Sequence, residues 1–204
     1  VGSVGMVELK CETDFVAKSP DFVALVNDLA ELVAKSGEGA AAERQQQIDD
    51  LKVTLKENIE VGRVEKVAVA DGQVVDTYLH KQEGRGVNAV VVVLDGGDAE
   101  LAHDISIHIA FTKPAYLRRD EVPQTAIDDE RSTLEEITRK EGKPEQALPK
   151  IVEGKLGGWF KRVGEKGKPG GALNEQAWIH DEKQSVQQAL GSAKIVRFAQ
   201  VIIG

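Results

Sequence analysis

Four histidines and one cysteine are the side chains of this sequence best suited to catalysis or to metal binding. His103 and His108 lie five positions apart, so on a helix they would project about 140° from each other and could not share a metal ion. Asp104 and His108 stand at i and i+4, a spacing that is typical of an ion pair on a helix surface. Cys11 has no second cysteine with which to form a redox or metal-binding motif. The sequence therefore predicts neither a metal centre nor a nucleophile paired with a base.

Three glycine-containing runs could in principle bind a phosphate group, but the elements and residues around them do not match known phosphate-binding motifs. The run Gly37–Ala42 resembles part of a dinucleotide-binding fingerprint, but it follows an expected helix instead of a strand. The Gly-Lys pairs that begin at Gly142 and Gly167 are each followed by proline, and both lack the upstream glycine of a phosphate-binding loop. We therefore expect a protein that is not an enzyme and that carries no cofactor and no metal.

The charge balance excludes some classes of partner. The 204 residues include 26 basic and 34 acidic side chains, and the net charge of −8 argues against a general binder of nucleic acids or anionic membranes. The longest apolar run, residues 89–94, is far too short to span a bilayer. A single cysteine fits a reducing compartment, and we expect a cytoplasmic location. Because the chain begins at Val1 inside an expected strand, we also expect a segment that precedes it.

The stretch at residues 11–18 lies where a strand pattern gives way to a long helix. Apolar residues at strand spacing precede it, and Ser19 then serves as an N-cap with Pro20 at the first helical position. Phe15 lies between these elements and has no periodic apolar partner. The pattern alone favours Phe15 as an internal plug, because most aromatic side chains are buried. The alternative is an aromatic side chain that protrudes into a partner.

The remaining patterns predict an α+β fold. Asp71-Gly72 predicts a two-residue hairpin, and the apolar run at residues 87–94 is typical of a central strand covered on both faces. Two amphipathic helices around Gly142-Lys143-Pro144 predict an antiparallel helical hairpin that protrudes as an arm about 30 Å long. After an opening strand that ends near Glu12, we expect helices at residues 19–35, 40–56, 99–111, 123–140, 148–163 and 185–190, and strands at residues 61–70, 73–80, 87–94 and 195–203.

These elements divide the chain into two subdomains, each with a small antiparallel sheet packed by helices, and the arm. The first subdomain, residues 1–60, holds the opening strand, the stretch at residues 11–18 and two helices. The second subdomain, residues 61–121 with 164–204, holds an antiparallel sheet and a helix. The helical arm, residues 122–163, is inserted in the second subdomain.

Two surface features have alternative interpretations. Tyr78 and His80 end a predicted hairpin strand, where His80 is either a surface histidine or an interface contact. A basic cluster near the base of the arm is either a solvated surface or an RNA contact; its members are Lys155, Lys161, Arg162, Lys166 and Lys168. The competing functional interpretation is thus a non-catalytic scaffold or RNA-associated module that binds through the arm.

Several motifs, in order along the chain, resemble those of elongation factor Ts, the nucleotide exchange factor of bacterial translation. The most specific is Glu12-Thr13-Asp14-Phe15-Val16-Ala17-Lys18, which resembles the family's signature. Glu57-Asn58-Ile59 and Tyr78-Leu79-His80 resemble the family's Gly-Glu-Asn-Ile and Tyr-x-His runs, and Ile151–Lys155 resembles a run in its coiled-coil hairpin. Lys56 departs from the family pattern, which often has glycine at this position.

The resemblance implies a factor that binds the GTPase elongation factor Tu in its GDP-bound and nucleotide-free forms. It implies that a loop presses against the nucleotide domain of the GTPase; the loop residues are Thr13, Asp14, Phe15 and Val16. Phe15 would enter an apolar pocket, and Asp14 would displace groups that hold Mg²⁺ and the β-phosphate. The residues implied on the same face are Leu55, Glu57, Asn58 and Arg63. Tyr78 and His80 are implied in a second contact, with another domain of the GTPase.

The resemblance also bears on other partners. It implies neither membrane contact nor direct nucleic-acid contact. Both a homodimer and a 2:2 complex with the GTPase are compatible with it.

Overall fold

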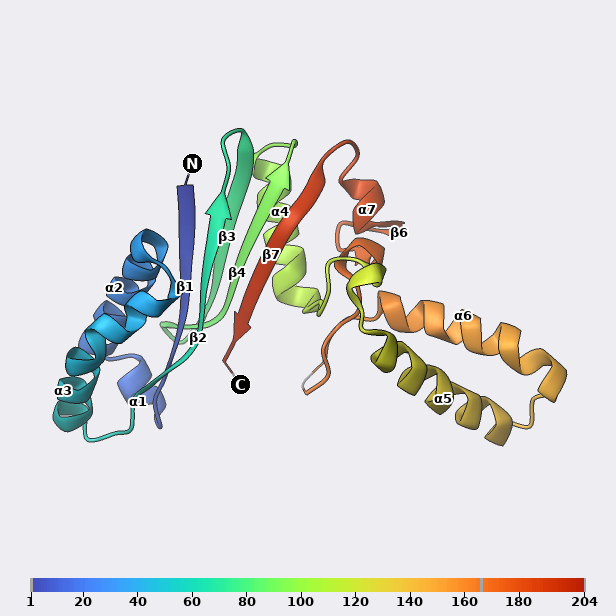
Figure 1. Ribbon diagram of the computed structural model, residues 1–204, viewed down its shortest axis with the longest axis horizontal. Coiled ribbons are helices and arrows are strands. Elements are labelled where there is room, and N and C mark those ends of the chain that lie inside the picture. Colours follow the sequence, from blue (N-terminus) through green and yellow to red (C-terminus); the bar gives the residue numbers. More distant parts are fainter. Residues whose placement is uncertain (1, 166, 204) are drawn as a thin grey trace. The chain divides into compact units, whose positions relative to one another are not determined.

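The computed structural model describes residues 2–165 and 167–203, which fall into two compact units (Figure 1). Unit 1 holds the residues up to Ala110 together with those from Ala193 onward, and unit 2 holds Phe111–Ser192. Helices occur together with small antiparallel sheets, so the predicted α+β class is confirmed. The finer division of the chain at residues 60, 121 and 163 stays a prediction.

Unit 1 contains two sheets and the helices that cover them. Its elements in chain order are β1 (Gly2–Lys10), α1 (Asp14–Ala17), α2 (Pro20–Ser36), the 3-10 segment η1 (Glu38–Arg44), α3 (Gln45–Leu55), β2 (Glu60–Val69), β3 (Gln73–Gln82), β4 (Arg85–Asp95), α4 (Ala99–Thr112, whose last turn passes into unit 2) and β7 (Lys194–Ile202). The helix predicted at residues 40–56 is thus a 3-10 segment followed by a shorter α-helix.

The sheet of β1 and β2 has apolar residues on both of its faces, because each face packs on a different layer. On one face, Leu9 of β1 joins an apolar cluster with α2 and α3. On the other face, Met6 of β1 and Val67 of β2 pack against Val91 and Val93 of β4. Figure 1 shows the result within unit 1: the α2 and α3 pair covers one side of the β1–β2 sheet, and the second sheet covers the other.

The second sheet has the strand order β3-β4-β7, with all neighbours antiparallel. Its central strand β4 is covered on both faces, as its continuous apolar run predicts. The face of Val91 and Val93 packs on the first sheet, and the opposite face meets α4, where the Asn88 amide donates to the Ala110 carbonyl at 2.9 Å. Gln200 of β7 reaches the same helix and donates to the Ile109 carbonyl at 3.2 Å.

The hairpin predicted at Asp71-Gly72 is wrong, because the strands on its two sides belong to different sheets. A tight turn does form there, with Gly72 at a positive φ of 82° and the Gln73 amide donating to the Ala70 carbonyl at 3.2 Å. The turn, however, carries the chain from β2 to the neighbouring layer. A two-residue turn signal specifies a local reversal and does not specify which strands pair. The true hairpin joins β3 to β4 through Glu83 and Gly84.

Unit 2 contains the predicted helical arm and a small base. Its elements in chain order are the 3-10 segment η2 (Arg119–Glu121), α5 (Gln124–Lys140), η3 (Glu145–Ala147), α6 (Leu148–Lys161), η4 (Leu173–Glu175), β5 (Ala177–Trp178), β6 (Asp181–Ser185) and α7 (Val186–Ala189). The two arm helices have 17 and 14 residues, so they are about 20–25 Å long, which is shorter than predicted. The β5–β6 pair has no counterpart among the predicted strands, because neither strand shows an apolar alternation.

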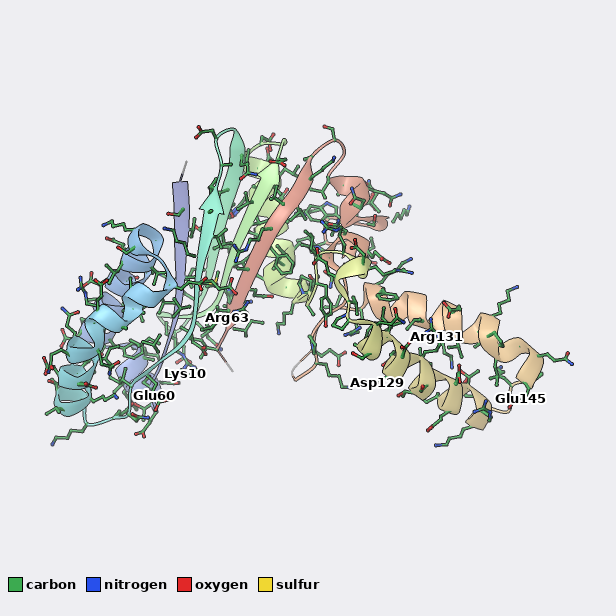
Figure 2. The ribbon with its side chains drawn as sticks, viewed as in Figure 1. Lys10, Glu60, Arg63, Asp129, Arg131 and Glu145 are labelled. Atoms are coloured by element: carbon green, nitrogen blue, oxygen red, sulfur yellow. The ribbon has the colours of Figure 1, made fainter. Side chains whose placement is uncertain are left out.

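The two arm helices are joined by apolar and ionic contacts. Leu156 and Phe160 of α6 form an apolar cluster with Val122 at the base of the arm. Farther out, Arg131 of α5 pairs with Glu153 of α6 at 3.1 Å. Figure 2 labels Arg131 on α5 and Glu145 at the end of the arm where the chain reverses. No helix among the described residues has both the length and the apolar character needed to cross a membrane.

Candidate partner-binding site

The stretch that follows β1 forms the single helical turn α1, where the resemblance implied a loop. Thr13 caps this turn: its hydroxyl accepts a hydrogen bond from the Val16 amide at 3.4 Å, and its carbonyl accepts one from the Ala17 amide at 3.1 Å. Ser19 closes the other end by donating its hydroxyl to the Val16 carbonyl at 2.8 Å, and it also caps α2. Hydrogen bonds to the backbone at both ends therefore fix the path of α1.

Phe15 is 88% exposed, whereas its neighbour Val16 is buried in the cluster below α2 and α3. Successive residues of a helix project about 100° apart, so the burial of Val16 directs Phe15 away from the core. The internal-plug interpretation of Phe15 is therefore wrong. An exposed aromatic side chain of this size on a firmly anchored turn is a candidate contact for a partner.

Glu57 connects α1 to the segment that follows α3. One of its carboxylate oxygens accepts hydrogen bonds from the Glu12 and Thr13 backbone amides, both at 3.0 Å. The other oxygen accepts a hydrogen bond from the Thr13 hydroxyl. These hydrogen bonds lower the pKa of Glu57 below the ordinary value of 4.5, and the bond from the Thr13 hydroxyl has the largest effect. The structure thus brings Thr13 and Glu57 together, and it gives Glu57 an internal partner.

Replacing Glu57 with glutamine should destabilise unit 1 in a pH-dependent way. Since its folded-state pKa lies below its unfolded value, the Glu57 carboxylate stabilises the fold above that unfolded value, and this contribution is lost as the pH falls through the folded-state pKa. We expect the wild type to melt at a higher temperature than Glu57→Gln at neutral pH, and the gap to narrow in acid. Thermal unfolding over a pH series measures the gap. A gap that does not change with pH would contradict the assignment.

Lys56 ends α3 in the left-handed conformation, with φ 56° and ψ 36°. This geometry gives a physical reason for glycine at this position in the resembling family, because a side chain in this region costs about 1–2 kcal/mol. Lysine therefore places strain directly before Glu57.

We expect Lys56→Gly to raise the free energy of unfolding by about 0.5–1 kcal/mol, because relief of the left-handed strain exceeds the added entropy of the unfolded chain. Urea unfolding measures this change. Lys56→Gln is the matched control, since it removes the charge and keeps the strain, and it should give no gain. Equal stabilisation by glutamine and glycine would assign the effect to charge instead.

Two more of the predicted site residues lie close to Glu57 in the chain. Leu55 is half-buried against the same apolar cluster as Val16. Asn58 is exposed, and its side-chain amide donates to Glu60 at 2.8 Å. These residues border α1, and Asn58 has a side chain that a partner could reach.

Arg63 lies farther along β2 than the other predicted residues. Its guanidinium pairs with Glu65 and donates to the Gln200 carbonyl of β7 at 2.7 Å, and its amide donates to Glu8 at 3.0 Å. In Figure 2, Lys10 and Glu60 lie at one end of the β1–β2 sheet and Arg63 lies farther along it. Arg63 thus links the two sheets of unit 1, and its exposed part remains available to a partner.

The second predicted contact, Tyr78 and His80, lies on one face of β3. The Tyr78 hydroxyl is 3.3 Å from His80 Nδ1, and the two rings stack with centroids 6.3 Å apart. Two residues that the sequence did not indicate complete the group: the His103 ring meets Tyr78 edge-on, and His103 Nδ1 is 3.3 Å from Asp76. No sequence signal places His103 beside Tyr78, because His103 comes from α4 and joins the group only in the folded chain.

Ion pairs between α1 and the β3–β4 hairpin were also absent from the sequence prediction. Asp14 pairs with Arg85 at 2.7 Å, and Lys18 pairs with Glu83 at 2.6 Å. The hairpin lies about 70 residues away in sequence, so only the packing of the two sheets brings these charges together.

Two described members of the basic cluster have partners within unit 2. Lys155 pairs with Glu141 at 2.9 Å, and the Arg162 guanidinium lies over the Trp159 ring, 4.3 Å from its centroid. Lys161 and Lys168 are exposed, and Lys166 lies outside the described residues. These contacts favour a structural role over RNA binding for Lys155 and Arg162.

The described part of the chain places neither a metal site nor a reactive thiol beside the partner-binding candidates. Among the described residues, no group of three or more histidine, cysteine, aspartate or glutamate side chains could hold a metal ion. Burial first, and then the charge of Glu57, raise the pKa of the Cys11 thiol. Cys11 therefore stays protonated near neutral pH and is a poor nucleophile.

The motifs around α1 and Glu57 belong to a recognised pattern. The profile of the family described as Elongation factor TS matches residues 12–204. The chain belongs to the elongation factor Ts family. It is accordingly an elongation factor of protein biosynthesis, and every predicted site residue lies within the matched region.

Bacterial members of the elongation factor Ts family align with most of the chain. The elongation factor Ts of Leifsonia xyli subsp. xyli is 42% identical over 201 residues, which cover 93% of this chain and 69% of the relative. Those of Renibacterium salmoninarum and Streptomyces avermitilis are 43% and 40% identical, and each alignment covers 98% of this chain. These alignments cover 74% and 73% of the two relatives.

Proposed function

We propose that this chain is the guanine nucleotide exchange factor of elongation factor Tu and that Phe15 is the wedge that opens the nucleotide site. The observation that carries the proposal is the exposure of Phe15 on a turn whose next residue is buried. A side chain held in this way can enter a partner's pocket with little loss of conformational entropy. The chain then acts without a cofactor and without breaking a covalent bond, in the cytoplasm.

In the proposed complex, the α1 turn presses against the nucleotide domain of the GTPase. Phe15 enters an apolar pocket, and the Asp14 carboxylate competes with groups that hold Mg²⁺ and the β-phosphate of GDP. Thr13 and Glu57 hold the turn in shape, which the hydrogen bonds between them support. Asn58 and Arg63 extend this contact along the same unit. Leu55 and Val16 pack beneath the turn and support it from the core.

The free energy needed to accelerate GDP release exceeds what the burial of Phe15 alone can supply. Accelerating GDP release by ~10⁴-fold corresponds to about 5.5 kcal/mol of differential stabilisation, whereas burying one phenylalanine contributes about 1.5–3 kcal/mol. The remainder is assigned to the lost Mg²⁺ and phosphate contacts and to the second contact at Tyr78 and His80. A partly stacked tyrosine and an exposed histidine suit such a contact.

Thermodynamic linkage then explains how the factor is released. If binding of the chain weakens the binding of nucleotide, nucleotide must weaken the binding of the chain by the same factor. The chain therefore binds the nucleotide-free GTPase more tightly than the GDP-bound form, and rebinding of nucleotide releases it.

Stopped-flow release of a fluorescent GDP analogue from elongation factor Tu tests the proposal. We expect the release rate to rise by several orders of magnitude as the chain is added at millimolar Mg²⁺. The rise should saturate with the concentration of the chain, because a complex precedes release. A release rate that stays at its spontaneous value would contradict the proposed function.

A further inference from the structure

Two ion pairs bind α1 to the turn of the β3–β4 hairpin. Asp14 Oδ1 lies 2.7 Å from Arg85 Nη1, and Lys18 Nζ lies 2.6 Å from Glu83 Oε2. Asp14 and Lys18 stand at i and i+4, so they lie on the same side of α1. Glu83 and Arg85 flank Gly84 at the hairpin turn. Each element thus offers one acidic and one basic side chain to the other, although the two are distant in sequence.

The position of these pairs around α1 controls the direction of Phe15. In helical geometry, the side chains of Asp14 and Lys18 project about 40° apart. Relative to Asp14, the side chain of Phe15 projects at about 100° and that of Val16 at about 200°. Val16 is fixed in the core on one side, and the two ion pairs act on nearly the opposite side. Contacts on opposite sides prevent the turn from rolling about its own axis, which would redirect Phe15.

α1 cannot supply this rigidity by itself. It has four residues, and an isolated turn of this length is not stable in water. Glu57 holds its first residues through the Glu12 and Thr13 amides, but this contact lies at the N-terminal end. At the C-terminal end, the Ser19 hydroxyl bonds to the Val16 carbonyl, and the pair between Lys18 and Glu83 adds a contact on the hairpin side.

The hairpin turn keeps a residue that is poorly suited to its backbone. Glu83 and Gly84 have φ of 51° and 87°, which is the pattern of a tight turn that favours Asn-Gly. A glutamate there is strained, but its carboxylate reaches Lys18 and forms an ion pair. An asparagine side chain is shorter and uncharged, so it could not form this ion pair. Glu83 is therefore better explained by its contact with α1 than by the turn.

We propose that Glu83 and Arg85 are positioning residues that brace the α1 turn against the β3–β4 hairpin and thereby fix the direction of Phe15. The inference rests on the proposed function of Phe15 and adds the element that aims it. Because β3 also carries Tyr78 and His80, the same hairpin supports both proposed contacts with the GTPase. Docking at one contact would thus hold the other in place.

The variant Glu83→Asn separates the brace from the stability of the turn. Asparagine tolerates the left-handed conformation, so the melting temperature should stay the same or rise. Loss of one partly exposed ion pair should nevertheless slow GDP release by about two- to five-fold. A residue with a merely structural role would lower the rate only together with stability. Glu31→Gln, which removes the exposed partner of Lys35 on α2, is the matched control and should leave the rate unchanged.

A charge exchange provides the rescue. Lys18→Glu and Glu83→Lys should each slow release, and the double variant should return the rate to within about two-fold of the wild type, because the pair is restored with opposite polarity. Glutamate and lysine at position 83 have the same backbone strain, so comparing the single and double variants isolates the effect of the charges. A double variant that is as slow as the slower single variant would overturn the brace.

Hydrogen exchange distinguishes failure of the brace from failure of the proposed function. The Ala17 and Lys18 amides donate to the carbonyls of Thr13 and Asp14, so Glu83→Asn should lower their protection whether or not the chain promotes GDP release. Unchanged protection of these amides overturns the brace alone. A wild-type chain that does not accelerate release contradicts the proposed function, and in that case the protection of the two amides still tests the brace.

Discussion

Phe15→Ala should slow the chain-stimulated release of GDP from elongation factor Tu by about 30-fold, which corresponds to about 2 kcal/mol of lost wedge contact. The same change should alter the free energy of unfolding by less than about 0.5 kcal/mol, because the ring is 88% exposed and supports no core. Stopped-flow release with a fluorescent GDP analogue and urea unfolding of the same preparations measure the two quantities.

A second exposed phenylalanine supplies the control for that prediction. Phe111 is 70% exposed and lies in unit 2, so Phe111→Ala removes a similar apolar surface without touching α1. Its release rate should equal that of the wild type. Normal exchange by Phe15→Ala would remove Phe15 from the mechanism, and a collapse of stability would return it to a packing role.

Gly5→Ala should destabilise unit 1 by about 3 kcal/mol or more and lower its melting temperature by about 10 °C. A Cβ atom at Gly5 would lie 2.0 Å from the Ala30 carbonyl oxygen and 2.7 Å from the Ala34 amide nitrogen. These are backbone atoms of α2, so no side-chain rotation can relieve the overlap. The helix would have to move away from β1, which would open the apolar cluster that includes Leu9 and Val16.

Gly2→Ala is the matched control on the same strand. A Cβ atom at Gly2 meets nothing within 4 Å, so its melting temperature should stay within about 2 °C of the wild type. Scanning calorimetry of the two variants compares them directly. Similar melting temperatures for Gly5→Ala and Gly2→Ala would mean that α2 does not lie directly on β1 as described.

Local sequence signals are sufficient to predict the elements whose ends and buried faces depend only on neighbouring residues. Ser19 and Pro20 predicted the start of α2, and its apolar spacing predicted the buried stripe that faces β1. The continuous apolar run of β4 predicted a central strand, because only a strand covered on both faces buries consecutive residues. The helical arm was predicted from two amphipathic patterns around a breaker.

Features that depend on long-range packing could not be predicted in this way. The turn at Asp71-Gly72 was recognised, but its strands pair elsewhere, since β2 pairs with β1 from the beginning of the chain. The local pattern around Phe15 favours burial, and only the resemblance to the elongation factor Ts family implies an exposed ring; its direction follows from the burial of Val16. The partners of Lys18 and Asp14 lie in a hairpin about 70 residues away, beyond any local pattern.

Photo-crosslinking from position 15 tests whether Phe15 contacts the nucleotide domain of elongation factor Tu. A benzophenone analogue of phenylalanine at position 15 keeps an aromatic ring on α1, and the same analogue at position 111 serves as the control. We predict a crosslink from position 15 to the nucleotide domain of elongation factor Tu, reduced by excess GDP and Mg²⁺, and no such crosslink from position 111. A crosslink from position 15 to another domain, or no crosslink while GDP release is still accelerated, would contradict the proposed role of Phe15.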